Sequence, residues 1–328
     1  MMPDSGSFTI DVHLDPADWS THLAEETRRG LQEDPPWIPP VWFYDEVGSK
    51  LFDQITRLEE YYPTDAERSI LRAHAGDIAS TTGAETLIEL GSGTSEKTML
   101  LIDALHGAGT LRRIAPFDVS EEVLRSSARS IATQLPGVDV HAVVGDFHQH
   151  LDRVPADGPS VLAFLGSTIG NLDPDQRSVF LGQVRMALDA DDWLLLGTDL
   201  VKDPTRLLAA YDDAAGVTAE FNLNALTVMN RELGADFDRD AFTHRAHWDA
   251  SERRIEMHLV AATDQRVLLS GLEDLVLDLA AGDHIRTEIS TKFTPDGIAA
   301  ELADAGLVVA DRWFDDAGDF LVSLARPA

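Results

Sequence analysis

Cysteine is absent from this 328-residue sequence. Its absence excludes disulfide bonds, thiolate catalysis and metal sites with cysteine ligands. The sequence also lacks any apolar run of about 18 residues, so we expect no membrane-spanning helix. Residues 1–15 are acidic and lack the apolar core of a signal peptide, which argues against secretion and predicts a cytoplasmic protein.

Basic residues are scarce. The formal charge is −31, from 57 acidic against 26 basic residues, and only four residues are lysine. Such a surface repels nucleic acids and anionic lipids, so neither nucleic acid nor membrane is expected as a partner. We interpret the acidity as a solvated surface that promotes solubility. A monomer that acts on a small molecule is the expectation.

A glycine-rich turn follows an expected buried strand, Thr86–Leu90, and precedes an expected helix, 96–105. Here a ligand can approach bare backbone at the positive end of a helix dipole. The phosphate-binding pattern Gly-x-x-x-x-Gly-Lys-Thr fits from Gly91 to Thr98, except that Glu96 replaces its second glycine. A dinucleotide fingerprint requires glycine there too. Because a carboxylate repels polyphosphate, the motif favours a nucleoside such as S-adenosylmethionine (SAM), with a purely structural turn as the alternative.

Strands and helices alternate after residue 86, which predicts an α/β fold with a parallel sheet and right-handed crossovers. Further strands are expected at 112–117, 138–144, 160–165 and 193–200, and helices at 121–135 and 174–188. Ser120 is expected to cap the first of these helices. The chain closes with an expected helix, 295–305, and a hairpin of strands 307–314 and 320–325.

The pattern changes after Lys202. Helices are expected at 203–215 and 223–233, followed by antiparallel strands at 242–248, 254–262 and 266–269, and residues 283–292 again alternate as a strand does. Before the central motif we expect a strand at 8–14 and helices at 18–31, 51–58 and 66–78. We interpret the middle block as an insertion that folds with the N-terminal segment into a second domain.

Four residues follow the expected parallel strands at their carboxyl ends: Gly91, Asp118, Asp146 and Asn171. Ligands of doubly wound sheets bind at this edge. Asp118 can accept hydrogen bonds from both hydroxyls of a ribose, and Asp146 from an adenine amino group, with Phe147 beside the base. Each carboxylate alone could be a helix cap, but their order together favours an adenosyl ligand. Methyl transfer needs mainly alignment and a neutral nucleophile.

The chain has only four tyrosines, and all lie outside the expected parallel strands: Tyr44, Tyr61, Tyr62 and Tyr211. Tyr62 is interpreted as a packing residue. Two histidine doublets have possible metal-ligand spacing: His148 with His150, and His244 with His247. Since neither doublet has partners at a clear spacing, we interpret them as ordinary surface or core histidines and expect no metal site.

Several motifs together resemble the histidine-specific Nα-methyltransferases of ergothioneine biosynthesis. The motifs are Phe43-Tyr-Asp-Glu-Val-Gly-Ser-Lys-Leu-Phe-Asp-Gln-Ile-Thr56, Glu60-Tyr-Tyr-Pro-Thr64, Glu89-Leu-Gly-Ser-Gly-Thr-Ser-Glu-Lys-Thr98, Phe117-Asp-Val-Ser120 and Gly166-Ser-Thr-Ile-Gly-Asn171. The resemblance covers nearly the whole chain. It implies that SAM is the methyl-donor cosubstrate and that the α-amino group of L-histidine is methylated three times, giving Nα-trimethylhistidine (hercynine).

The resemblance also implies the fold. A Rossmann-like class I methyltransferase domain, which binds SAM, is expected at residues 65–201 and 292–328. A second, α+β domain, which binds the substrate, is expected from the N-terminus and the insertion, at residues 8–64 and 202–291.

The roles of individual residues are implied in the same way. SAM is expected to contact Gly91, Ser92, Gly93, Lys97, Asp118, Asp146 and Phe147. Asn171 and Tyr44 are expected to position the amino group, and Tyr211 to contact the carboxylate. The imidazole is expected to be held by Tyr61, Glu288 and Ser290, within a pocket walled by Phe52 and Met257. A neutral imidazole has one donor and one acceptor, and both can form hydrogen bonds with a carboxylate and hydroxyl groups.

Two other functions remain open from the sequence. One is a SAM-dependent N-methyltransferase that acts on another amino acid or a small amine. The other is a SAM-binding sensor or scaffold of the same fold, because a fold does not by itself fix a function.

Overall fold

The computed structural model describes residues 8–91, 97–147, 149–154 and 157–328. Two compact units divide the chain. Unit 1 comprises residues 1–15, 65–200 and 293–328, and unit 2 comprises residues 16–64 and 201–292. Residues 8–15 lie in unit 1, whereas the sequence placed them in the second domain. The reason is that β1 (Thr9–Val12) pairs in parallel with β4 (Asp139–Val144), from Thr9 beside His141 to Val12 beside Val144.

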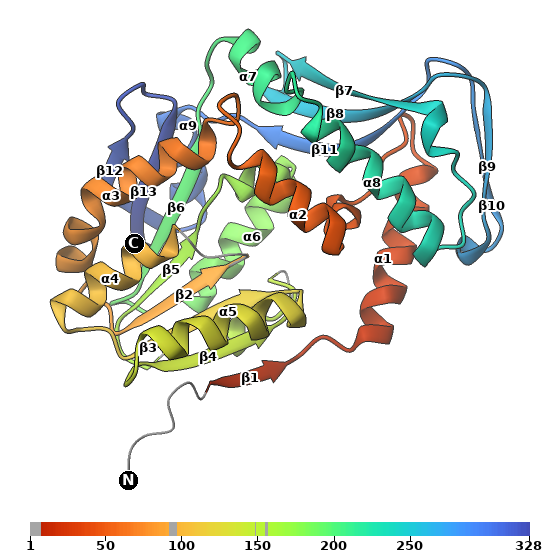
Figure 1. Cartoon of the computed structure of the whole chain (residues 1–328). Coiled ribbons are helices and arrows are strands. Elements are labelled where there is room, and N and C mark those ends of the chain that lie inside the picture. Colours follow the sequence, from red (N-terminus) through yellow and green to blue (C-terminus); the bar gives the residue numbers. More distant parts are fainter. Residues whose placement is uncertain (1–7, 92–96, 148, 155–156) are drawn as a thin grey trace. The chain divides into compact units, whose positions relative to one another are not determined.

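Unit 1 is built on one sheet of eight described strands, in the order β1-β4-β3-β2-β5-β6-β13-β12 (Figure 1). The first six strands in this order are parallel, and β13 runs antiparallel to both of its neighbours. The remaining strands are β2 (Thr86–Leu90), β3 (Arg113–Asp118), β5 (Ser160–Phe164), β6 (Trp193–Asp199), β12 (Leu307–Phe314) and β13 (Phe320–Pro327). This is the doubly wound sheet that the sequence predicted.

Helices and apolar clusters cover both faces of this sheet. Every residue of β2 is buried, as expected for a parallel strand with both faces covered. Leu87 belongs to one buried cluster and its neighbour Ile88 to another, because successive side chains point to opposite faces. The helices of unit 1 are α3 (Pro63–Thr82), α4 (Thr98–Ala108), α5 (Glu121–Gln134), α6 (Pro174–Ala187) and α9 (Pro295–Asp304), with short 3-10 turns at Leu151–Arg153 and Thr168–Asn171.

Unit 2 has its own apolar core. A three-stranded antiparallel sheet, in the order β11-β8-β7, combines β7 (Phe242–Asp249), β8 (Arg254–Ala261) and β11 (His284–Thr291). The helices are α1 (Pro16–Leu31), α2 (Glu46–Ile55), α7 (Pro204–Tyr211) and α8 (Val217–Glu232). Short 3-10 turns lie at Pro40–Phe43, Arg239–Ala241 and Ser270–Leu272. In Figure 1, α7 and α8 run along the sheet of β7 and β8.

The antiparallel pair β9 (Gln265–Leu269) and β10 (Leu275–Leu279) completes unit 2. The sequence predicted β9 but not its partner. The start of α2 and the cap of α5 also differ from prediction. α2 begins at Glu46 because the Asp45 carboxylate accepts from the backbone N–H of Gly48 and caps it. Ser120 occupies the N-cap position of α5, but its hydroxyl makes no capping hydrogen bond, which corrects the predicted cap. No helix among the described residues is long and apolar enough to cross a membrane.

Candidate active site

The carboxyl ends of the parallel strands form one edge of the sheet in unit 1, and this edge is the candidate site for a ligand. The strand order reverses at β2, which lies between β3 and β5, and ligands of doubly wound sheets bind at this point. Gly91 follows β2 with φ of +67°, a conformation that favours glycine, and its N–H donates to the carbonyl of Phe117 at 2.8 Å. Ser92, Gly93 and Glu96 lie outside the described residues.

Asp118 and Asp146 lie at the ends of neighbouring strands. Asp118 is half-buried at the end of β3, and its Oδ1 accepts from the backbone N–H of Ser120 at 2.9 Å. Asp146 is buried just after β4, and its Oδ2 accepts from Gln149 at 3.1 Å. Parallel pairing places Asp118 beside Val144, so both carboxylates belong to the same edge of the sheet. These residues fit the hydroxyl and amino groups of an adenosyl ligand.

Phe147 is anchored in the core of unit 1. Its ring centroid lies 5.7 Å from that of Phe164 and 5.4 Å from that of Phe180. The side chain is half-buried. One part of the ring therefore packs against aromatic neighbours, and the exposed part is the surface that a base could contact.

Lys97 is linked to a buried carboxylate that the sequence did not indicate. Its ammonium forms an ion pair with Glu67, which lies on α3 and is fully buried. Glu67 also accepts from the backbone N–H of Gly166 at 2.8 and 3.0 Å. The carboxylate thus joins the loop after β2 to the loop after β5 and fixes the position of Lys97 at the sheet edge.

Asn171 ends the 3-10 turn Thr168–Asn171, in the loop that follows β5. The preceding Ser167 has φ of 58°, and its Oγ accepts from the backbone N–H of Asp199 at 2.9 Å. The backbone N–H of Gly170 donates to the carbonyl of Ser167 at 2.8 Å. These bonds hold the half-buried Asn171 at the carboxyl edge, where the sequence predicted it.

Four of the predicted substrate-binding residues form a continuous row of rings in unit 2. The ring centroids of Tyr44 and Phe52 are 5.8 Å apart, those of Phe52 and Tyr61 6.3 Å, and those of Tyr61 and Tyr211 6.1 Å. Every pair meets edge to face, a favourable arrangement for aromatic rings. Phe221 lies against both Tyr44 and Phe52. Residues from three separate segments are thereby brought together.

Tyr211 and Ser290 are joined by a lysine that the sequence did not single out. Their hydroxyl oxygens are 2.7 Å apart, and Lys292 Nζ donates to the tyrosine oxygen at 2.9 Å and to the serine oxygen at 2.8 Å. All three side chains are buried. A lysine at a strand end is usually exposed, so the sequence context did not indicate that Lys292 is buried. The low number of lysines in the chain was the only feature that drew attention to it.

Glu288 and Ser290 lie on one face of β11. Glu288 is opposite Met257 on β8, and Ser290 is opposite Ile255, two positions along. Met257 is 2% exposed, so its side chain contributes to the core of unit 2. Glu288 keeps some exposure, but burial raises its pKa to about 7, against the opposing charge of Lys292. Its carboxyl group can therefore change charge near neutral pH.

The histidine doublets have structural partners. His244 Nε2 lies 2.8 Å from the carbonyl oxygen of Tyr211, and its Nδ1 lies 2.8 Å from the side-chain amide of Asn222. Burial lowers the pKa of His244, which suits a neutral ring that donates to that carbonyl. His150 Nδ1 accepts from the backbone N–H of Asp146 at 3.2 Å, while His148 lies outside the described residues. Within the described ranges, no group of three potential ligand side chains could hold a metal ion.

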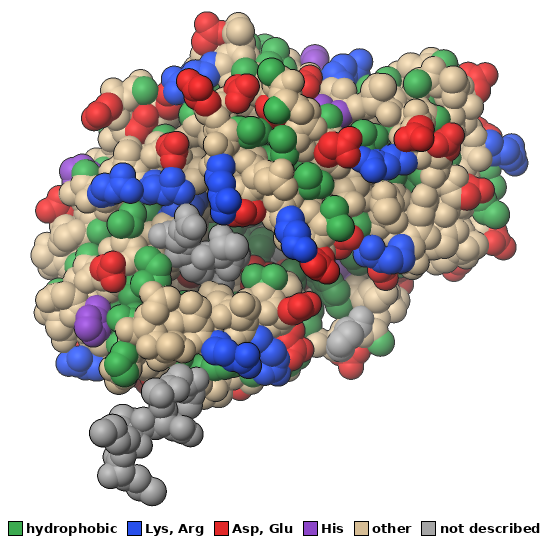
Figure 2. Space-filling model, in the orientation of Figure 1, with side chains coloured by type: hydrophobic (Ala, Val, Ile, Leu, Met, Phe, Trp, Pro, Cys, Tyr) green, Lys and Arg blue, Asp and Glu red, His purple; other side chains and the backbone are tan. Residues whose placement is uncertain are grey.

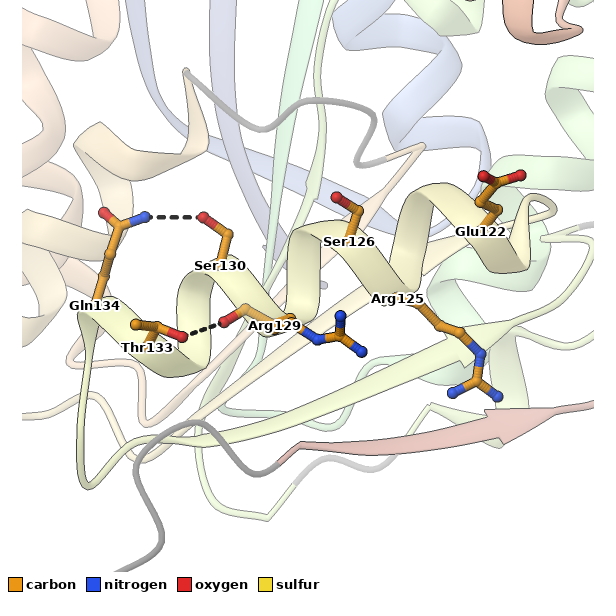
Figure 3. A pocket seen from close by; sticks show the side chains of 7 residues that line it. All are labelled: Glu122, Arg125, Ser126, Arg129, Ser130, Thr133 and Gln134. Atoms are coloured by element: carbon orange, nitrogen blue, oxygen red, sulfur yellow. Dashed lines mark hydrogen bonds between the residues drawn. The ribbon is translucent and has the colours of Figure 1, made fainter.

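Two hollows on unit 1 carry little of this chemistry. The larger, of about 570 Å³, follows one face of α5 (Figure 3) and is lined by Glu122, Arg125, Ser126, Arg129, Ser130, Thr133 and Gln134. The other, of about 350 Å³, is lined by Phe147, Gln149, Leu151, Asp152, Gln183, Met186 and Ala187. Of the predicted site residues, only Phe147 lines either hollow. Neither of these two hollows therefore gathers the residues that the sequence predicted to bind SAM or the substrate.

Comparison with known proteins gives a consistent result. Residues 23–327 match the family described as "Histidine-specific methyltransferase, SAM-dependent". A histidine N-alpha-methyltransferase of Mycolicibacterium smegmatis is 55% identical, over 92% of this chain and 94% of that protein. A protein of the same name from Mycobacterium tuberculosis is 55% identical, over 93% and 95%. Ergothioneine biosynthesis protein 1 of Neurospora crassa is 37% identical over 86% of this chain but only 32% of its own length. The chain belongs to the family of SAM-dependent, histidine-specific methyltransferases.

Proposed function

We propose that this protein uses SAM to methylate the α-amino group of L-histidine three times, giving Nα-trimethylhistidine (hercynine), the first step of ergothioneine biosynthesis. The family match over residues 23–327 supports the choice of methyl donor and substrate. Unit 1 is proposed to bind SAM and unit 2 to bind histidine. Each unit supplies residue types that suit its ligand.

The observation that carries the choice of histidine is the arrangement on β11. Glu288 and Ser290 share one face of this strand, and Ser290 is hydrogen-bonded to the hydroxyl of Tyr211 at 2.7 Å. A carboxylate and hydroxyls so close together match the one donor and one acceptor of a neutral imidazole. Leucine or phenylalanine offers no N–H to the Glu288 carboxylate, and a charged group that loses a hydrogen bond when the ligand covers it costs a few kcal/mol.

The SAM-binding residues are proposed to be Gly91, Ser92, Gly93, Lys97, Asp118, Asp146 and Phe147. SAM supplies an electrophilic methyl group on its sulfonium sulfur. The residues of the chain bind and align: Asp118 accepts from ribose hydroxyls, Asp146 from the adenine amino group, and Lys97 offers a positive charge held by Glu67. No strong base is needed, because the amine can lose its proton to solvent.

Asn171 and Tyr44 are proposed to orient the amino nitrogen, so that its lone pair is free for attack on the methyl carbon. Tyr211 is proposed to contact the substrate carboxylate, and Tyr61, Glu288 and Ser290 the imidazole. Phe52 and Met257 complete the pocket wall. Each transfer forms a nitrogen–carbon bond, breaks the sulfur–carbon bond and converts SAM into S-adenosylhomocysteine.

We further propose that the protein acts in the cytoplasm as a monomer with no nucleic-acid or membrane partner. Its proposed substrates are small metabolites, and all assigned residues come from one chain. Figure 2 shows acidic and basic side chains interspersed on the visible face, which agrees with a solvated surface. Light scattering of the purified protein, with and without SAM, tests the oligomeric state.

The test of the function is a product-mass assay with SAM and each of the twenty amino acids, run on the wild type and on Glu288→Ala. The wild type should add three methyl groups to histidine. The variant should keep SAM binding, lose histidine affinity and discriminate ~10²–10⁴-fold less against phenylalanine and leucine. Asp278→Ala, on an exposed carboxylate of β10 in the same unit, is the matched control and should behave as the wild type.

The outcomes separate the alternatives. Methylation of a different amine would identify another N-methyltransferase, and SAM binding without turnover would identify a sensor. An unchanged preference for histidine in Glu288→Ala would show that Glu288 does not read the imidazole. Loss of activity on addition of a chelator would restore the histidines as candidate metal ligands.

A further inference from the structure

Lys292 is one of the largest fully buried side chains in the described structure, with 1% of its surface exposed. It directly follows β11, and its backbone N–H donates to the carbonyl of Arg253 at 2.7 Å. Burying an ammonium group is costly unless partners compensate for the loss of water. The partners of this group are therefore informative about its role.

The hydrogen bonds among the side chains of Lys292, Tyr211 and Ser290 fix the polarity of the cluster. An ammonium group only donates, so the oxygens of Tyr211 and Ser290 both accept from Lys292, at 2.9 and 2.8 Å. One of the two hydroxyl protons lies between these oxygens, which are 2.7 Å apart. The other hydroxyl proton can point neither at the ammonium group nor into the shared bond. The pair is thereby a donor toward any further group that it meets.

We infer that Lys292 is a positioning residue of the histidine site, which holds the hydroxyls of Tyr211 and Ser290 as hydrogen-bond donors toward an acceptor atom of the substrate. The inference rests on the proposed function, in which Tyr211 and Ser290 contact histidine. Lys292 acts through these two residues.

Further contacts restrain the tyrosine. Lys292 Nζ lies 4.6 Å from the centroid of the Tyr211 ring, where a cation is attracted to the ring face. The backbone carbonyl of Tyr211 lies 2.8 Å from His244 Nε2, and its ring meets that of Tyr61 edge to face. The phenol is thus held on several sides, and its hydroxyl has little freedom to reverse its role.

The charge of Lys292 also acts on Glu288, the carboxyl group that is proposed to bind the imidazole. Glu288 lies on the same strand, and its pKa is about 7 because burial raises it while Lys292 lowers it. An ionised Glu288 accepts from the imidazole N–H, and the hydroxyl pair donates to the other nitrogen or to the carboxylate. Lys292 thereby favours the acceptor form of Glu288 and the donor form of the hydroxyl pair.

The experiment compares Lys292→Met, which keeps most of the length of the unbranched side chain and removes its charge, with the wild type. Loss of oriented donors should raise KM for histidine ~10–100-fold, the range for hydrogen bonds to charged groups, while SAM affinity stays within about twofold. The acid limb of the pH dependence of kcat/KM should move to higher pH, because the charge that lowers the pKa of Glu288 is gone. A purely structural role would not move that limb.

Lys202→Met is the matched control, because Lys202 also lies in unit 2 and donates to a tyrosine hydroxyl, that of Tyr62, at 2.6 Å. It should leave both KM and the pH profile unchanged. Lys292→Arg, which keeps the charge and the donors, should recover part of the lost affinity. In the Tyr211→Phe, Ser290→Ala background, Lys292→Met should have a much smaller effect, since neighbours that act together are non-additive.

An unchanged KM for histidine in folded Lys292→Met would overturn the inference, as would full additivity in the double-mutant cycle. If Lys292→Met does not fold, Lys292→Arg and the Tyr211→Phe, Ser290→Ala variant carry the test: the arginine variant must keep the pH limb in place, and the double variant must raise KM for histidine. If the wild type does not methylate histidine, the proposed function fails instead. The two failures are therefore distinguishable.

Discussion

Glu288 is a carboxyl group whose buried surroundings disfavour its ionised form. Its pKa rises from 4.5 to about 7, mainly through burial. In the unfolded chain the carboxyl group ionises at its ordinary pKa, so between about pH 4.5 and pH 7 the folded state binds more protons than the unfolded state. The stability that this group contributes is present below that window and is lost as the pH rises through it.

The prediction is that wild type loses stability relative to Glu288→Gln on going from about pH 4 to about pH 8, by roughly 1–3 kcal/mol at 1.36 kcal/mol per pH unit. The upper value is reduced because the side chain keeps some exposure. Urea unfolding at both pH values, without ligands, measures the difference. Parallel pH profiles for the two proteins would show that Glu288 titrates normally.

Asp118 gives a second prediction, on SAM binding. Asp118→Ala should weaken SAM binding by ~1.5–3 kcal/mol, the range for hydrogen bonds to a charged group, as measured by calorimetry. Asp139→Ala is the control, because Asp139 begins the neighbouring strand β4, at the opposite edge of the sheet, and pairs with Arg113 at 2.7 Å. Equal SAM affinity in the two variants would remove Asp118 from the ribose site.

Individual residues differ in how well their placement could be predicted from the sequence. Glu288 and Ser290 could be placed on one face from their spacing alone, and the register of β11 with β8 confirms it. Lys292 and Glu67 could not be found, because only the packing shows that their charges are buried. A lysine or glutamate in a polar sequence context looks like a solvated residue.

Among the elements, the parallel strands were the easiest to predict, because short apolar runs bounded by turn residues alternate with longer helical patterns. β10 was missed, since its five residues form a short apolar run that is interrupted by Asp278 and lies outside the strand–helix alternation of the parallel sheet. Asp278 pairs with Arg266 on β9. β1 was recognised as a strand but assigned to the wrong unit. Its partner β4 lies about 130 residues away, and no local pattern specifies such a pairing.

Helix caps provide a matched comparison. Asp173 caps α6 with a reciprocal capping box, in which its carboxylate accepts from the backbone of Gln176 and the side chain of Gln176 accepts in return. Asp173→Ala should therefore cost about 1 kcal/mol of unfolding free energy, whereas Ser120→Ala at the start of α5 should cost only a few tenths. Denaturant unfolding of both variants measures these two losses of unfolding free energy. An equally large loss of unfolding free energy in Ser120→Ala would show that Ser120 caps α5, as the sequence predicted.

Gly197 on β6 leaves room for Glu67. A Cβ at this position would lie 2.0 Å from Glu67 Oε1, so Gly197→Ala must displace a buried carboxylate from Lys97 and Gly166. We expect a loss of about 1–3 kcal/mol of unfolding free energy. Gly76→Ala, in the same helix as Glu67 and with nothing near its Cβ, should instead gain roughly 0.5–1 kcal/mol. Similar effects of the two substitutions would show that Glu67 adjusts freely.

For the whole molecule, the dominant electrostatic fact is the formal charge of −31. The described lysines all have partners within the chain: Lys50 with Glu46, Lys97 with Glu67, Lys202 with Tyr62, and Lys292 with Tyr211 and Ser290. Because 57 acidic residues face only 26 basic ones, more than half of the acidic side chains lack a basic residue of their own, and they repel one another in the compact state more than in the expanded unfolded chain.

Salt should therefore stabilise this protein. Raising NaCl from about 0.02 M to about 0.5 M shortens the screening length several-fold and weakens repulsion over the whole surface, while exposed ion pairs such as Lys50 with Glu46 contribute little that salt could remove. We expect Tm, measured by calorimetry, to rise by about 3 °C, which corresponds to roughly 2 kcal/mol of added stability for a chain of this length. A sucrose series of equal osmolality is the control for effects that do not depend on charge. A Tm that falls with NaCl would mean that favourable ion pairs outweigh the net repulsion, which would reverse this account of the acidic surface.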